Sequence, residues 1–166
     1  MIPVRHTNRP FPLHPLGRTA GIKTVKEFDI KVKALRCKVL VFRDAVELRR
    51  SWRKLFGDDL GAGFDGAVQD LSTLVENFAI PGKVVRRREV DRNFFAFMAL
   101  HAGNLGLDVL AHEATHAALA YVRRLGTRNV WREQPGCGSN EEALAYPVGI
   151  ITYRLVEGLR RAGLLP

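Results

Sequence analysis

Cysteine is scarce in this sequence, and long apolar runs are absent. Only Cys37 and Cys137 occur, so the chain lacks the several bridges that hold small secreted domains together, and we expect free thiols in a reducing compartment. No apolar run reaches the ~18 residues of a membrane-spanning helix, so none is expected. The first ten residues lack the apolar stretch of a secretory signal. These absences predict a cytoplasmic protein.

Acidic residues are few beside the basic ones. The chain has 26 Lys and Arg against 17 Asp and Glu, a net charge of +9, and residues 94–122 contain no Lys or Arg. Such a charge favours an anionic partner: nucleic acid, an anionic membrane surface or an acidic protein. No helix-turn-helix, zinc finger or aromatic RNA-binding motif is visible, so nucleic acid is not the favoured partner, although the charge alone keeps it open. A solvated, solubilising surface is the simpler explanation of this charge.

The length and the apolar content predict one domain with its own core. The chain has 166 residues, of which 46% are hydrophobic. Residues 1–22 hold four of the eight prolines and show no periodicity, which predicts an extended arm. Residues 23–166 are expected to form the single domain.

Apolar periodicity and turn residues predict strands first and helices later. The expected elements are a strand or hairpin over 28–42, an amphipathic helix over 44–56 ended by Gly57, a loop over 57–66, a short helix or loop over 67–78, a turn at Pro81-Gly82, a strand over 83–90, a turn over 91–93, a buried strand over 94–102, a helix after Gly106 that ends near Gly126, and a last helix that starts near Ser139, is kinked near Pro147 and stops at Gly163. This order predicts an α+β fold.

One short sequence in the first of the late helices carries recognisable chemistry: His112-Glu-Ala-Thr-His116. Residues four apart share a helix face, so His112 and His116 can hold one zinc ion, and Glu113 can take a proton from a zinc-bound water. The surrounding residues are uncharged and rich in alanine, which predicts a buried helix. Polar groups in such a helix need partners. A metal would satisfy them; the alternative is a polar patch that is hydrogen-bonded within the core.

This helix resembles the active-site helix of the zincin metallopeptidases. The metzincin branch needs a Gly and a third His at the positions of Leu119 and Val122, so that branch is excluded. The resemblance then points to the gluzincin branch, whose third ligand is a Glu on a later helix. Over residues 94–150 the chain is similar to that pattern, and its overall form is similar to small metallopeptidases of bacteria and their phages.

The third ligand implied by the resemblance is Glu142, because Glu142 and Ala145 match the E-x-x-A pattern of that helix. Glu141 competes with it, since adjacent residues point about 100° apart on a helix and only one can face the metal. Both acids also suit the first turn of a helix capped by Ser139. Cys137, in the loop before them, is a weaker candidate for an extra ligand.

The resemblance implies further roles, which are expectations here. Tyr146 stands where many relatives carry Asp or Asn, so a supporting carboxylate is either missing or supplied from elsewhere, for instance by Asp108. One turn from Glu142, Tyr146 is also our candidate to donate a hydrogen bond to the oxyanion, with Tyr121 and His101 as weaker ones. The family fold is a small twisted sheet packed on the active-site helix, and its edge strand pairs with extended substrate. Residues 94–102 are the candidate for that strand or its neighbour.

The sequence as a whole predicts a zinc metallopeptidase that acts on a peptide or protein substrate, with Zn²⁺ on His112, His116 and Glu142. The alternative is a basic structural or adaptor protein, virion-associated if phage-encoded, whose zincin fold holds a mainly structural zinc. Glu113 separates the two, because a structural site does not need a base. The substrate, the host and the oligomeric state do not follow from the residues.

Overall fold

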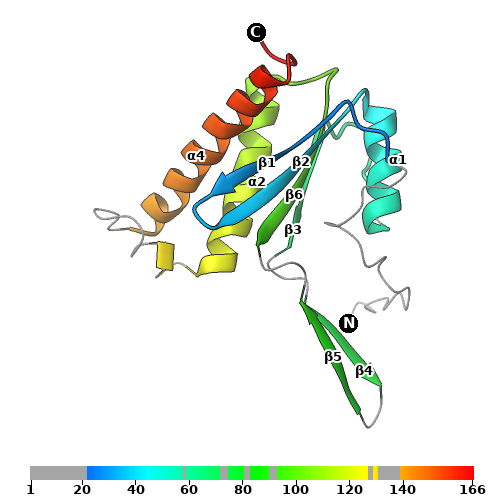
Figure 1. Ribbon diagram of the computed structural model, residues 1–166, viewed down its shortest axis with the longest axis vertical. Helices are drawn as coiled ribbons and strands as arrows, with labels where there is room; N and C mark the ends of the chain where they lie inside the picture. The colour runs from blue at the N-terminus through cyan, green and yellow to red at the C-terminus, as the bar shows by residue number, and fades with distance from the viewer. Residues whose placement is uncertain are drawn as a thin grey trace.

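The computed structural model describes residues 22–57, 59–71, 75–80, 83–89, 93–126, 129–130 and 139–166. Figure 1 shows the arrangement of its helices and strands. Their bounds are β1 Lys26–Val32, β2 Leu35–Phe42, α1 Ala45–Phe56, β3 Gly66–Asp70, β4 Val75–Ile80, β5 Lys83–Glu89, β6 Phe94–His101, α2 Leu107–Leu125 and α4 Asn140–Arg161. The predicted arm before Ile22, the turn at Pro81-Gly82, most of the turn at 91–93 and Cys137 lie outside the described residues.

The fold is α+β, as predicted. Four strands form a mixed sheet in the order β1-β2-β6-β3, in which β2 and β6 are parallel and the other neighbours are antiparallel. Strands β4 and β5 pair with each other in a separate two-stranded sheet. In the four-stranded sheet β1 and β3 are therefore the edge strands.

The prediction of a helix or loop over residues 67–78 is wrong. Residues 66–70 form β3, and residues 75–80 form β4. The sequence GAVQD is short and has weak strand propensity. It becomes a strand because β6 supplies a complete antiparallel partner, from Gly66 opposite Leu100 to Asp70 opposite Ala96. A tertiary partner has decided what the local sequence left undecided.

The two faces of the sheet bury separate apolar clusters. On one face, Val39, Met98 and Leu100 pack with buried residues of α2 and α4. On the other face, Leu40 and Phe97 pack with Trp52 and Phe56 of α1, and the rings of Phe56 and Phe97 meet edge to face. This division follows from strand geometry, since successive side chains of β2 and β6 point to opposite faces. Figure 1 shows α1 on the far side of the sheet from α2 and α4.

The helices begin and end at the residues that the sequence indicates. Asp44 caps α1 by accepting two backbone N–H bonds, and Gly57 ends it in the left-handed conformation at φ 76°. Helix α2 ends at Gly126, whose φ is 78°. The Ser139 hydroxyl accepts from the backbone N–H of Glu142 at the start of α4.

Helix α4 runs past Pro147 to Arg161, and Gly163 follows it with a φ of 71°. It packs beside α2 and runs antiparallel to it (Figure 1). None of the described helices is long and apolar enough to cross a membrane.

Candidate metal centre

The His112-Glu113-x-x-His116 sequence lies in the first half of α2, where both histidines are on the exposed face of the helix. Their Nε2 atoms lie 3.1 Å apart. Two nitrogens bound to one tetrahedral zinc are about 3.4 Å apart, so a small adjustment of the rings would let this pair hold the ion. Burial, and after it the charge of His112, lowers the pKa of His116. A lower pKa favours the neutral imidazole, which is the form that binds a metal.

Glu113 is turned about 100° around the helix from His112, toward the sheet, and is only 5% exposed. Burial raises the pKa of its carboxyl to about 7, and the nearby His112 opposes that rise in part. Its Oε2 atom is buried and has no hydrogen-bond partner within the described part of the chain. A buried oxygen without a partner is costly. A polarised water or a bound cation beside it would remove that cost.

Strand β3 approaches Glu113 closely at Gly66. A β-carbon added at Gly66 would lie 2.7 Å from Cγ and 2.9 Å from Oε1 of Glu113, so any larger residue would displace the carboxylate or the strand. Val68, two residues farther along β3, packs against the same cluster as α2. At the far end of the strand, the Asp70 carboxylate pairs with the Arg123 guanidinium of α2 at 3.0 Å. The edge strand thus runs along the helix that carries the histidines.

A second polar cluster holds the start of β3. The Asp65 carboxylate is 3.1 Å from Nε2 of His101 and accepts from Asn104 Nδ2 at 2.9 Å. The hydrogen bond from His101 holds the pKa of Asp65 below its usual range. His101, which we considered as an oxyanion donor, is therefore engaged with Asp65. These contacts tie the loop before α2 to the residue that precedes Gly66.

Glu142, the expected third ligand, is exposed in the first turn of α4, as is Glu141. Tyr121 of α2 and Tyr146 of α4 line one small pocket of about 130 Å³, which fixes the level at which the two helices meet. Because the helices are antiparallel (Figure 1), Glu142, which precedes Tyr146, lies farther from His116 than Tyr146 does. Tyr121 is about 7.5 Å along α2 from His116, and Glu142 is about 6 Å along α4 from Tyr146.

The structure therefore brings together some of the predicted site residues and not others. Among the described residues, no group of three His, Cys, Asp or Glu side chains is arranged to hold a metal ion. Tyr146, 46% exposed, lies with Tyr121 beside Lys33 of the β1–β2 turn. Tyr121 is buried, and its ring meets that of Phe95 edge to face. Asp108 is exposed in the first turn of α2.

Gly66, Asp65 and Asn104 were missed by our reading of the sequence. The only local signal was the loop rich in glycine and aspartate that precedes β3. Their importance depends on a strand that the sequence did not predict, because only the pairing of β3 with β6 brings residue 66 over Glu113.

Comparison with known proteins finds no family model, no curated protein and no solved structure that matches this chain. Its function therefore has to be inferred from its own residues and their arrangement.

Proposed function

We propose that this protein is a zinc-dependent metallopeptidase. His112 and His116 are two of the ligands, Glu142 is the proposed third, and Glu113 is the general base. The observation that carries the proposal is the convergence of the two Nε2 atoms, 3.1 Å apart, beside a buried carboxylate with an unsatisfied oxygen. Zinc held there supplies Lewis acidity, which lowers the pKa of water and polarises a peptide carbonyl.

Glu113 is suited to move a proton near neutral pH. In the metal-free protein burial raises the pKa of this carboxyl to about 7, which makes it a stronger base than an ordinary glutamate, so it can accept a proton from water and return it to a leaving amine. Its burial beside Gly66 also limits the directions in which the side chain can turn. What supports this role is that the sequence places the carboxylate next to a metal-ligand pair, and that no described hydrogen bond satisfies its Oε2.

The substrate in this proposal is an extended peptide. Strand β3 pairs with β6 on one side only, among the described strands, so its outer backbone groups are open to another strand. A peptide that pairs there would lie beside the helix that carries His112 and His116. The scissile bond of a peptide paired beside Gly66, at the start of β3, would lie near Glu113. Residues 94–102, which we named as the edge strand or its neighbour, correspond to the neighbour.

Glu142 is the least supported part of this ligand set. The E-x-x-A pattern favours it, and the first turn of α4 must come closer to His116 for it to bind. The absence of a third donor beside the histidines, within the described residues, counts against a catalytic zinc, and equally against the structural zinc of the alternative adaptor function, which needs four ligands. An incomplete site would bind zinc weakly and without catalysis.

Metal analysis beside a peptide-cleavage screen tests the proposal. The purified protein should contain about one zinc per chain, and it should cleave members of a broad peptide library in a reaction that a chelator stops and added zinc restores. A zinc-loaded protein that cleaves nothing would favour the structural or adaptor role. A protein without any zinc would remove both functions.

A further inference from the structure

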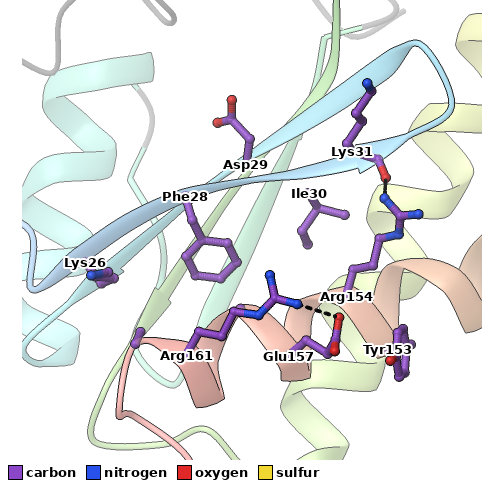
Figure 2. A pocket seen from close by; sticks show the side chains of 11 residues that line it. Lys26, Phe28, Asp29, Ile30, Lys31, Tyr153, Arg154, Glu157 and Arg161 are labelled. Atoms are coloured by element: carbon purple, nitrogen blue, oxygen red, sulfur yellow. Dashed lines mark hydrogen bonds and ion pairs between the residues drawn. The ribbon is translucent and has the colours of Figure 1, made fainter.

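A hollow lies between edge strand β1 and the C-terminal half of α4. The residues that line it are far in the sequence from His112 and His116. Its volume is about 510 Å³. Figure 2 shows the side chains that line it. Those used below are Lys26, Phe28, Tyr153, Arg154, Glu157 and Arg161. None of them belongs to the proposed metal centre.

The floor of this hollow is formed by Phe28 and Gly158. A β-carbon at Gly158 would collide with the Phe28 ring, so the ring can lie against α4 only because residue 158 is a glycine. Tyr153, one turn earlier on α4, is 64% exposed. The hollow thus offers an aromatic floor and an aromatic side chain that is open to a ligand.

The backbone of β1 also faces this hollow. Strands β1 and β2 form a tight hairpin in which Val32 is opposite Leu35, so alternate residues of β1 direct their backbone groups away from β2. Lys31 is one of these, because its carbonyl accepts a hydrogen bond from the Arg154 guanidinium (Figure 2). Glu27 and Asp29 share that alternation. In the described part of the chain no other strand pairs with this edge.

The side chains around the hollow have a positive surplus. The carboxylate of Asp29 points to the other side of the strand from Phe28, as Figure 2 shows, and the Lys38 ammonium holds it there at 2.7 Å. The described charged side chains on the near side are those of Lys26, Arg154, Arg161 and Glu157, three cations and one carboxylate. Glu157 pairs with Arg161 at 3.4 Å.

We propose that this hollow is a docking site for an acidic, extended peptide segment of a partner protein, which adds to β1 as a fifth strand. Its backbone would pair with the outward groups of β1, and its acidic side chains, at alternate positions, would meet Lys26, Arg154 and Arg161. A nucleic acid fits the same charge less well. It lacks the amide groups that an open strand edge can pair with.

Binding of a fluorescein-labelled ten-residue peptide, with Glu at alternate positions and Val or Thr between them, tests this site. Fluorescence anisotropy with the full-length protein should show saturable binding at about 50 mM salt. Lys26→Glu with Arg161→Glu should weaken it by at least about tenfold, because two attractive charges become repulsive. The matched control is Arg49→Glu with Arg50→Glu on α1, which makes the same change of net charge on the other face of the sheet. It should change the affinity less than about threefold.

Three further measurements separate this site from its alternatives. Two peptides, each N-methylated at one of the two alternate sets of backbone amides, should differ in affinity, because only one set faces β1. Equal binding of both would overturn strand addition. An oligothymidylate of equal charge should bind more weakly than the peptide. Equal affinity, or equal losses from both double variants, would reduce the hollow to part of a non-specific basic surface. A chelator should leave peptide binding unchanged. If the chelator abolished binding, the peptide would be assigned to the metal centre on α2 instead.

Discussion

The backbone of Gly66 lies against the side chain of Glu113, so closely that a β-carbon at residue 66 would be 2.7 Å from Cγ of the glutamate. The contact joins the edge strand to the residue that we propose as the base. It also explains why Glu113 is buried although its neighbour His112 is exposed. The position of the carboxylate therefore depends on the start of β3 as well as on α2.

Gly66→Ala should disturb this contact. The new methyl group has to displace either the carboxylate or the strand, and such overpacking costs about 1–3 kcal/mol of the free energy of unfolding. The matched control is Gly149→Ala in α4, where a β-carbon would meet nothing within 4 Å. It should stabilise the protein by up to about 1 kcal/mol, because alanine favours a helix. Urea unfolding of both variants measures this, and equal effects would contradict the close contact.

His112→Ala and His116→Ala should each abolish stoichiometric zinc binding, since either change removes one of two converging nitrogens. Inductively coupled plasma analysis of the dialysed protein gives the zinc content. The control replaces His6 and His14 by alanine, which removes two histidines outside the motif and should leave the zinc in place. Zinc retained when both His112 and His116 are absent would refute the metal centre.

The two adjacent glutamates of α4 give a matched pair. Glu142→Gln should weaken zinc binding by roughly ten- to a hundredfold, whereas Glu141→Gln should have little effect, because only one of two adjacent side chains can face the metal. Competition with a chromogenic chelator measures both affinities. If Glu141→Gln lowered the zinc affinity more than Glu142→Gln, Glu141 would be the third ligand instead of Glu142. If neither change matters, the third donor is another residue.

Glu113→Gln keeps the size of the side chain and removes the base. Zinc content and folding should survive, while any peptidase activity should fall by about two to four orders of magnitude. Activity on a fluorogenic peptide and zinc content are measured on the same sample. A variant that cleaves as fast as the wild type would show that Glu113 is not the base.

The raised pKa of Glu113 also predicts how the stability of the metal-free protein depends on pH. The folded carboxyl has a pKa of about 7 against 4.5 for the ordinary group, so the folded chain holds more protons between these values. The free energy of unfolding therefore falls as pH rises through this window. With chelator present, the free energy of unfolding of the Glu113→Gln variant should equal that of the wild type near pH 4. Near pH 8 the free energy of unfolding of the variant should exceed that of the wild type by roughly 1–2 kcal/mol, a value reduced for solvent screening. A pH-independent difference would contradict the shift.

Much of the fold follows from local patterns in the sequence. The alternation of apolar and basic residues predicted a strand or hairpin over 28–42, where β1 and β2 lie, and Gly57 ends α1 as expected. The buried strand that became β6, and the helices α2 and α4, were also predicted. These elements have strong periodicity and clear end signals, which depend only on neighbours in the chain.

The candidate site divides in a similar way. His112, Glu113 and His116 lie within two turns of one helix, so the spacing in the sequence is enough to place the two imidazoles together. The pairing of Glu142 with them is a relation between two helices, which no local spacing determines. The structure puts Glu142 near the other end of α2, and the third ligand stays a prediction.

The sequence by itself determined the helical motif, the residues that end its helix, and the strands and helices outside residues 66–80, because these depend on residues a few positions apart. Tertiary structure alone decided that residues 66–70 are a strand, that Gly66 covers Glu113, and that β1 is an edge of the described sheet beside three cations. The physical reason is that strand pairing and close packing join residues distant in the chain. A weak segment such as GAVQD takes its conformation from its partner.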